Sequence, residues 1–475
     1  MSGRATPVGA CRPAVTIVDE RGPSYWETVL IRGALRHHGV ASRVMGLEDA
    51  LDHSSGRDAP PVVPPSAPPN AVLDAPPAPL LLVVLLPAPD MDVSDLSMRL
   101  RDTFGGPRER VTVVLAGHGQ TLTILGRDAG ARPAPHEIVV LGEPQATIAR
   151  LATETAFLER SLGRVLVGGR PEARHFRAPP PGDGQAAGLA PDSPASLPVL
   201  TSLGCDKRCG YCTMASTRAK LYRGGIPRRP RPWPDLLEEL AGFSDRGVDG
   251  FQLLADQFLA ADPARNRDLA ELARRWGSVR TRRPRLTFTV APGEVVRNKN
   301  LLSEMASAFD LRPRLSVDSL DDQTLSLLDL DFDPPAAIEA LVFLEGLGLP
   351  TRVNYIFVRP GMTAPRLRAE LSRLLLVAEA TAHLSYREKL VLGHDIFSRR
   401  LEVLPGTPVA AKGTSARYEG DLPVEALRVV RAVQEAVGDL VEGGGRKDHP
   451  LAVAVEAGIR ALGGGGGGRR SPGRR

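Results

Sequence analysis

The sequence predicts an α/β protein with two domains in series, a doubly wound parallel sheet followed by a partial (βα)6, TIM-like barrel. Apolar runs rich in β-branched residues alternate with helix-period patterns in both halves of the chain, as in parallel sheets that are buried on both faces. Between the halves, residues 178–198 are rich in Pro, Gly, Ala and Ser, which is typical of an interdomain linker.

The first domain is predicted to span residues 12–170. Ser24 and Glu27 form a capping box for a helix that ends at Gly39, and residues 58–79 are a proline-rich insertion that cannot form helix or sheet. Apolar runs predict strands at residues 14–19, 42–47, 80–86, 110–117 and 137–143. Helical patterns lie between most of these strands, at Val93, Leu96 and Leu100, and at Ile148, Leu151 and Ala152. Ligands of such sheets bind beyond the carboxyl ends of the strands.

The second domain is predicted to span residues 199–395. Six runs predict its strands, at residues 198–202, 250–254, 285–290, 314–317, 352–357 and 389–392. Helical patterns separate them, so the chemistry of the barrel is expected at the carboxyl ends of the strands. A C-terminal extension follows at residues 396–460, and the Gly/Arg-rich tail at 461–475 is expected to be disordered.

Composition excludes several classes of function. The formal net charge is +5, but four arginines lie in the tail, so the rest of the chain is nearly balanced and nucleic acid is not expected as a partner. The longest apolar run, at residues 79–87, is far shorter than the roughly 20 residues of a membrane span, and no cleavable leader opens the chain. We therefore expect a cytoplasmic protein with no membrane partner and no disulfide framework.

Three of the four cysteines stand in the stretch GCDKRCGYCT, directly after the first predicted barrel strand. Their spacing is Cys205-x3-Cys209-x2-Cys212, while Cys11 has no companion and no assigned role. Thiolates suit zinc or iron-sulfur clusters, and a structural zinc site needs four ligands, one more than this loop offers. A [4Fe-4S] cluster held by three thiolates leaves one iron open to a second molecule. Zinc binding and unligated buried thiols remain the alternatives.

This loop, with Tyr211 before its last cysteine, resembles the C-x3-C-x2-C loop of the radical S-adenosylmethionine superfamily. The resemblance implies that Cys205, Cys209 and Cys212 bind a [4Fe-4S] cluster whose open iron chelates S-adenosylmethionine. It implies reductive cleavage of that cofactor to a hydrogen-abstracting radical, with the electron supplied by a donor such as flavodoxin or ferredoxin.

Further segments extend the resemblance. In FQLLADQF, Asp256 matches an acidic residue that reaches the cofactor after the second strand, and Gln257 replaces the usual second acid. In LSVDSLDDQTLSLL, Asp318 and Ser319 match the Glu-Ser pattern of the fourth strand, with Asp where Glu is common. The resemblance assigns Tyr211, Asp256, Asp318 and Ser319 to S-adenosylmethionine. The alternative for both aspartates is a helix cap or a solvated loop acid. The Pro-Gly segments at 358–363 and 403–410 also match the superfamily.

The first half is similar to the Rossmann-like, B12-binding-type domain that precedes the radical domain in a large subgroup. VVLAGHGQTL and VVLGEPQATIARL match its two glycine-containing loops, which implies cobalamin contacts at Gly117, His118, Gly142 and Glu143. An ordinary loop histidine and a helix cap are the alternatives for His118 and Glu143. The first loop lacks the Asp-x-His-x-x-Gly motif, so no histidine is placed to ligate cobalt from below.

The leading hypothesis is a cobalamin-dependent radical S-adenosylmethionine enzyme that methylates an unactivated carbon of a small metabolite or peptide. One alternative is radical chemistry without cobalamin, with a degenerate front domain. Another is a non-catalytic metal-binding interaction protein. A tRNA methylthiotransferase is disfavoured because the first half has no second cysteine triad.

Overall fold

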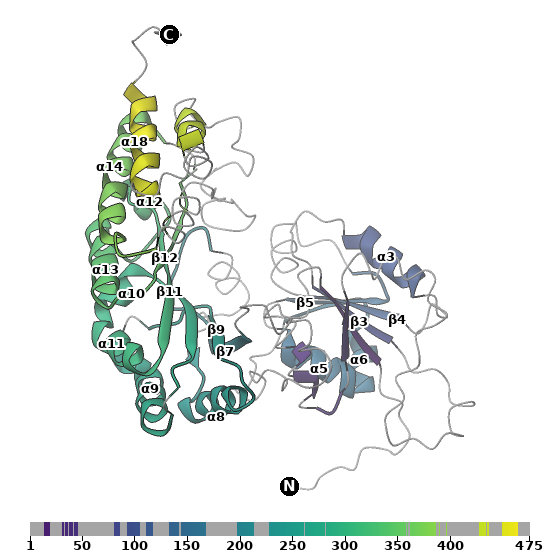
Figure 1. The fold of residues 1–475 in the computed structure, drawn as a ribbon. Helices are drawn as coiled ribbons and strands as arrows, with labels where there is room; N and C mark the ends of the chain where they lie inside the picture. The colour runs from purple at the N-terminus through teal and green to yellow at the C-terminus, as the bar shows by residue number, and fades with distance from the viewer. Residues whose placement is uncertain are drawn as a thin grey trace, which may run out of the picture. The chain divides into compact units, whose positions relative to one another are not determined.

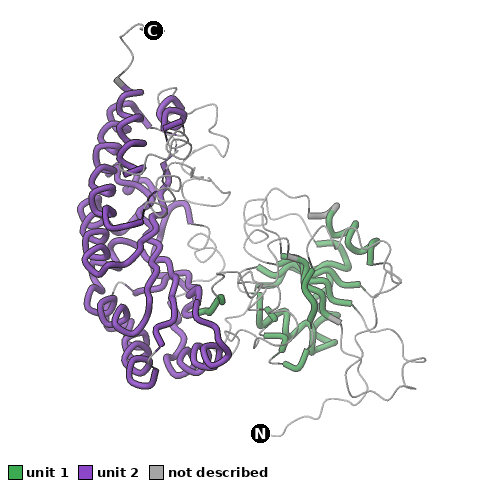
Figure 2. Tube along the Cα trace, viewed as in Figure 1, with its two compact units in different colours: residues 1–200, 217–225 green, residues 201–216, 226–475 purple. Residues whose placement is uncertain are grey.

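The computed structural model divides the chain into two compact units, residues 1–200 with 217–225 and residues 201–216 with 226–475 (Figure 2). The structure describes residues 14–19, 31–32, 34–36, 38–40, 42–45, 80–85, 93–104, 111–116, 133–141, 144–167, 197–212, 228–260, 262–280, 282–357, 359, 362–385, 389, 396, 427–433, 435–436 and 449–463. In this part of the chain, no helix is both long and apolar enough to span a bilayer.

The first unit is built on a parallel sheet with the strand order β2-β1-β3-β4-β5-β6. Its strands are β1 (Ala14–Asp19), β2 (Ser42–Met45), β3 (Leu80–Leu85), β4 (Val111–Ala116), β5 (Glu137–Leu141) and β6 (Arg164–Val167). Successive residues of β3 alternate between two apolar clusters: Leu81, Val83 and Leu85 pack on one face, Leu82 and Val84 on the other. Both faces are therefore buried, which confirms the predicted doubly wound sheet.

The helices of this unit cover the two faces of the sheet. Helix α3 (Val93–Thr103) places Leu96 and Leu100 in one cluster, and α5 (Gln145–Thr153) places its apolar side chains in the other, followed by α6 (Thr155–Ser161). Both predicted helical patterns are confirmed. The sequence did not predict α6 or β6, because β6 is a largely exposed edge strand that shows no continuous apolar run. The capping box at Ser24 and Glu27 and the insertion at 58–79 lie outside the described residues.

The second unit contains a six-stranded sheet with the order β12-β11-β10-β9-β7-β8, and a row of helices lies along the strands (Figure 1). Its strands are β7 (Leu197–Leu203), β8 (Arg229–Pro230), β9 (Gly250–Ala255), β10 (Arg285–Val290), β11 (Asp310–Asp318) and β12 (Arg352–Tyr355). Its helices are α8 (Trp233–Ser244), the 3-10 helix η5 (Pro263–Asn266), α9 (Arg267–Val279), α10 (Pro292–Arg297), α11 (Lys299–Ala308), α12 (Asp322–Leu327), α13 (Pro334–Gly346), α14 (Ala364–Ala380) and α18 (Pro450–Gly463).

Five of the six predicted barrel strands are confirmed. The prediction of a sixth at 389–392 is wrong at its first residue, because Lys389 is helical, and residues 390–392 lie outside the described residues. The sixth strand of this sheet is instead β8, a two-residue antiparallel edge strand. It contains Pro230, which cannot donate a ladder hydrogen bond and is therefore suited to an edge.

Two predicted boundaries are also corrected. Strand β7 begins at Leu197, so the last two residues of the predicted linker belong to the sheet, because Leu197 continues the apolar run. Helix α18 continues to Gly463, so the tail predicted to be disordered starts with three helical residues.

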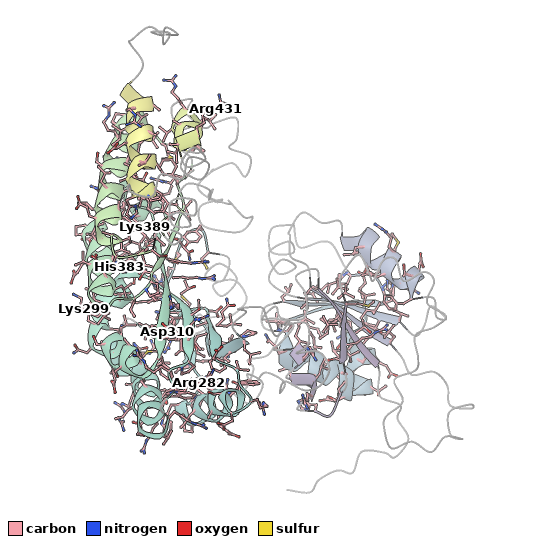
Figure 3. The ribbon with its side chains drawn as sticks, in the orientation of Figure 1. Arg282, Lys299, Asp310, His383, Lys389 and Arg431 are labelled. Carbon is pink, nitrogen blue, oxygen red and sulfur yellow. The ribbon has the colours of Figure 1, made fainter. Side chains whose placement is uncertain are left out.

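The helices that form the outer layer of the second unit bury the faces that helical periodicity predicts. In α9, Leu269, Leu272, Ala273 and Trp276 form one buried face, as the spacing predicts. Several exposed positions of this layer carry charged residues that form ion pairs. For example, Lys299 of α11, labelled in Figure 3, pairs with Glu339 of α13 at 2.6 Å.

The C-terminal helix α18 packs along α14 in the same unit (Figure 1). At Gly458 the approach is close, because an added Cβ atom would lie 3.2 Å from Leu371 Cδ1 and 3.2 Å from Val429 Cγ1. Glycine is needed here for space rather than for backbone conformation.

We predict that Gly458→Val lowers the free energy of unfolding by about 1–3 kcal/mol, since the added methyl groups overpack this contact. Chemical denaturation monitored by circular dichroism measures the loss. The control is Gly346→Ala at the end of α13, where an added Cβ meets nothing within 4 Å. A Gly458→Val protein as stable as the control would contradict the close packing of α18.

Candidate functional site

The three clustered cysteines lie on an irregular loop, residues 204–212, that directly follows β7. It opens at Gly204 with a φ of +83°, a backbone conformation that glycine adopts without strain. Cys205, Cys209 and Cys212 are partly exposed and form no disulfide. The Cys212 amide donates to the Cys209 carbonyl at 3.0 Å, which closes a turn between the last two cysteines. We call residues 204–212 the cysteine loop.

The end of β9 holds the start of the cysteine loop. Asp256 Oδ2 accepts a hydrogen bond from the Gly204 amide at 2.7 Å, and Gln257 Oε1 accepts one from the Asp206 amide at 2.8 Å. Below them, the Ser202 hydroxyl donates to the Gln257 carbonyl at 2.8 Å. Asp256 thus contacts the backbone of the cysteine loop, and Gln257 supplies a neutral acceptor at the position where the superfamily has a second acid.

A buried arginine that the sequence did not reveal strengthens this junction. Arg228 donates to the carbonyls of Gln257 at 2.9 Å and Phe258 at 2.5 Å, and its amide donates to Asp206 Oδ1 at 3.2 Å. Arg265 pairs with the other oxygen of Asp206 at 2.6 Å. Arg228 belongs to no recognised motif, because its partners lie 22 to 37 residues away in the chain.

The middle of the cysteine loop is held by α10. Lys207 Nζ lies 2.8 Å from Glu294 Oε1 and 3.6 Å from Asp331 Oδ1, and Glu294 is buried. Burial alone would lower the pKa of Lys207, but its attraction to Glu294 and Asp331 outweighs burial and raises the pKa. Lys207 is therefore a charged group inside the loop.

The end of the cysteine loop is held by the last residue of β11 and by a residue that follows this strand. The Gly210 amide donates to the Leu328 carbonyl at 2.6 Å, and the Tyr211 hydroxyl donates to Asp318 Oδ2 at 2.8 Å. Burial and the Asp318 carboxylate raise the pKa of Tyr211, so Tyr211 remains a neutral donor. Asp318 has a φ of +56°, and the β11–β12 register shifts between Ser316 and Asp318. Non-glycine residues in this conformation often mark functional sites.

A buried polar network lies beside Asp318. Glu370 of α14 accepts from the Ser319 hydroxyl at 2.9 Å and from the Tyr355 hydroxyl at 2.5 Å, and it pairs with Arg359 at 2.5 Å. The Ser319 side chain is therefore turned into the core rather than toward solvent. Its predicted contact with S-adenosylmethionine stays a prediction.

Sequence signals for this network exist but are weak. Glu370 falls on the apolar face of its helix with Leu367, Leu371 and Leu374, where a charge implies a buried partner. Arg359 stands in the Pro-Gly segment at 358–363, of which 358, 360 and 361 lie outside the described residues. The segment at 403–410 lies outside them entirely.

Three thiolates on one loop are a donor set that suits an iron-sulfur cluster. In the part of the chain that the structure describes, no three His, Cys, Asp or Glu side chains are grouped closely enough to hold one metal ion. A polynuclear cluster spaces its thiolate ligands farther apart than a single ion does, because each thiolate binds a different iron. Burial, together with the neighbouring Cys212, raises the pKa of the Cys209 thiol to about 12, so ligation requires a metal charge that stabilises the thiolate.

The front unit offers one described group for a ligand. Gln145, the first residue of α5, stands at the carboxyl edge of the sheet, since three residues separate it from the end of β5. Its side chain is buried, and its Oε1 accepts no hydrogen bond from the residues described. An unsatisfied buried acceptor suits an amide N–H donor, such as the side-chain amides of a corrinoid. Gly117, His118, Gly142 and Glu143 lie outside the described residues.

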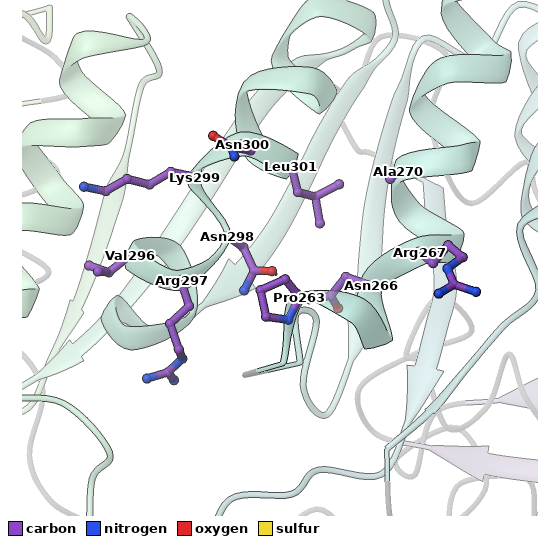
Figure 4. A pocket seen from close by; sticks show the side chains of 10 residues that line it. All are labelled: Pro263, Asn266, Arg267, Ala270, Val296, Arg297, Asn298, Lys299, Asn300 and Leu301. Carbon is purple, nitrogen blue, oxygen red and sulfur yellow. Dashed lines mark hydrogen bonds between the residues drawn. The ribbon is translucent and has the colours of Figure 1, made fainter.

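Two cavities of the second unit lie away from the cysteine loop. Figure 4 shows one of about 370 Å³ among the first residues of α9 and α11, where Asn266 donates to Asn298 at 2.9 Å. The other, of about 350 Å³, lies at the amino ends of β11 and β12, near Asp310 and Pro350. Neither cavity is lined by residues of the cysteine loop.

No protein-family model and no curated protein sequence matches the chain. Among solved structures, the cobalamin-dependent S-adenosylmethionine radical enzyme OxsB with aqua-cobalamin and S-adenosylmethionine bound has a TM-score of 0.62 and 12% identity, over 90% of this chain and 67% of that chain. The radical S-adenosylmethionine methyltransferase TsrM from Kitasatospora setae, with cobalamin and a [4Fe-4S] cluster bound, has a TM-score of 0.55 and 15% identity, over 77% and 73%. TsrM with tryptophan substrate and a cofactor analogue, aza-SAM, is equally similar, over 77% and 71%.

These likenesses confirm the fold that the sequence predicts. The structural neighbours of the chain are cobalamin-dependent radical S-adenosylmethionine enzymes, the group that its motifs resemble. At 12% to 15% identity, the likeness establishes the architecture of both units and leaves the roles of individual residues to be tested.

We predict that Tyr211→Phe lowers the free energy of unfolding by about 1–3 kcal/mol, because Asp318 loses this hydrogen bond in a buried site. A double-mutant cycle with Asp318→Asn, measured by chemical denaturation, isolates the pair. If Tyr211→Phe lowers the free energy of unfolding by the same amount in the parent and in the Asp318→Asn variant, the two side chains are not coupled and the prediction is wrong.

We also predict a pH dependence from Asp321, which caps α12 and pairs with Arg366. Burial acts to raise the pKa of Asp321, but hydrogen bonds from Arg366 and Thr324 outweigh it and lower the pKa to about 2. The unfolded value is about 3.9, so this stabilisation is present above pH ~4 and is lost as the pH falls toward 2. The stability difference between the parent and Asp321→Asn should therefore shrink over that window, and a constant difference in acid titrations would refute the assignment.

Proposed function

We propose that the chain is a radical S-adenosylmethionine enzyme that binds a [4Fe-4S] cluster and cobalamin and methylates an unactivated carbon of a small metabolite or peptide. The observation that carries the proposal is the cysteine loop, whose three thiols form no disulfide and which is held at the carboxyl ends of β7, β9 and β11. The likeness of the whole fold to cobalamin-dependent radical enzymes supports it.

The residues of this chain would prepare the site. Cys205, Cys209 and Cys212 would hold the cluster, which supplies the electron for cleavage of S-adenosylmethionine when both are bound. Asp256 and Gln257 hold the loop backbone, and Asp318 holds Tyr211, so the backbone of the cysteine loop would need little reorganisation on loading. We further propose that Tyr211, Asp256, Asp318 and Ser319 contribute to the S-adenosylmethionine site.

Cobalamin binding is proposed for the carboxyl edge of the front sheet. Its support is the doubly wound topology, whose ligands bind at this edge, together with the buried acceptor of Gln145. Gly117, His118, Gly142 and Glu143 are proposed contacts from the two loops of this edge. Cobalamin would carry the methyl group to the substrate.

The proposal implies partners of defined chemistry. A one-electron donor of the flavodoxin or ferredoxin type would reduce the cluster, and the reducing cytoplasm is the compartment in which thiols persist without forming disulfides. Nucleic acid is not a proposed partner because the chain is nearly balanced in charge apart from its tail.

We predict that anaerobic reconstitution with iron and sulfide loads about four of each per chain. The loaded protein should bind added hydroxocobalamin and release 5′-deoxyadenosine from S-adenosylmethionine under dithionite. Simultaneous replacement of Cys205, Cys209 and Cys212 by alanine should abolish loading and cleavage, whereas the control Cys11→Ala should retain both. Metal analysis, absorbance spectra and product chromatography measure the three properties.

Each failure has a distinct meaning. Absence of corrin binding by a loaded protein would remove the methylation proposal and leave radical chemistry without cobalamin. Absence of S-adenosylmethionine cleavage by a loaded, reduced protein would leave a non-catalytic metal-binding protein.

A further inference from the structure

The cysteine loop contains a buried ion pair that cluster ligation does not require. Lys207 lies between Cys205 and Cys209, with 15% of its side chain exposed, and contacts the 3% exposed Glu294 at 2.8 Å. Asp331, 3.6 Å from Lys207, is shared with Arg297 at 3.0 Å. The two cations and two carboxylates balance one another.

The carboxylate of Glu294 is fixed at both oxygens. Oε1 faces Lys207, and Oε2 accepts from the Ala291 amide at 3.0 Å, at the start of α10. It therefore cannot turn away from the lysine without giving up a backbone hydrogen bond. The backbone of Lys207 is held as well, because its amide donates to Cys205 Sγ at 3.4 Å.

Stability alone does not account for this pair. Desolvation of two buried charges offsets most of their attraction, and an apolar pair of similar size is often as stable. A charge beside a redox centre has a separate effect, because a cluster gains one negative charge on reduction and a nearby cation favours the reduced state while an anion opposes it.

We propose that Glu294 is a positioning residue that holds Lys207 against the cysteine loop and compensates its charge, so that the pair sets the reduction potential of the cluster. This inference rests on the proposed function, since it requires a cluster at Cys205, Cys209 and Cys212. With both partners present, a cluster held by Cys205, Cys209 and Cys212 would lie beside a cation that Glu294 largely neutralises, and its potential would stay low.

The test is a dithionite titration of the reconstituted protein without S-adenosylmethionine, in which the one-electron-reduced cluster is followed by electron paramagnetic resonance. Glu294→Gln leaves the cation of Lys207 less compensated and should shift the potential to more positive values. Lys207→Met should shift it to more negative values. The double variant restores charge balance and should titrate close to the parent, which separates the effect of charge from that of lost packing.

Two further variants keep the test decisive if a single variant loads poorly. Asp331→Asn should give a smaller positive shift than Glu294→Gln, because Asp331 is 40% exposed and farther from Lys207. Glu339→Gln removes a carboxylate from the outer pair with Lys299 and should leave the potential unchanged.

Single variants that load fully yet shift in the same direction, or do not shift, would overturn the inference. If Glu294→Gln does not load, an unshifted Asp331→Asn overturns it. A parent protein that takes up no cluster removes the proposed function and this inference together, whereas a loaded parent with unchanged variants removes the inference alone.

Discussion

The candidate site depends on how a nine-residue loop without regular structure is held in one conformation. Residues 204–212 have no ladder or helix to fix them, so their order comes from partners on other βα units. Asp256 and Gln257 bind the first part, Glu294 binds the middle, and Asp318 binds the last part. Parallel strands make this possible because their carboxyl ends lie at one edge of the sheet, where side chains from successive units can reach a common loop.

One residue that holds the cysteine loop, Asp318, has an unfavourable backbone conformation. A φ of +56° is unfavourable for a residue with a Cβ atom, by about 1 kcal/mol or more. The surroundings offset it: the Asp318 carbonyl accepts from the Ile356 amide at 2.8 Å, and the next residue, Ser319, is tied to Glu370. Glu370 is in turn neutralised by Arg359. The buried network thus fixes the turn that aims the Asp318 carboxylate at Tyr211.

Most strands and helices of both units could be predicted from the sequence, whereas the side-chain contacts that hold the cysteine loop could not. Strands such as β1 and β10 were predicted with their observed bounds, because period and apolar runs are local properties that survive folding. The partners Glu294 and Glu370 were missed, because Glu294 contacts Lys207 and Glu370 contacts Ser319 on other elements, and no local pattern encodes such pairings. Edge elements such as β6 and β8 were missed because exposed or two-residue strands carry no apolar run.

Gln257 shows how a departure from a family pattern can be consistent with the same architecture. In the structure, Gln257 Oε1 accepts a hydrogen bond from the Asp206 amide at 2.8 Å. An amide oxygen and a carboxylate oxygen can both accept such a bond with the same geometry. A carboxylate would add a third negative charge beside Asp206 and Asp256, close to thiols that must ionise in order to bind metal. The neutral side chain keeps the hydrogen bond without that repulsion. The glutamine at position 257 is therefore better explained by the negative charge that Asp206 and Asp256 already place beside the cysteine loop than by loss of a functional role at this position.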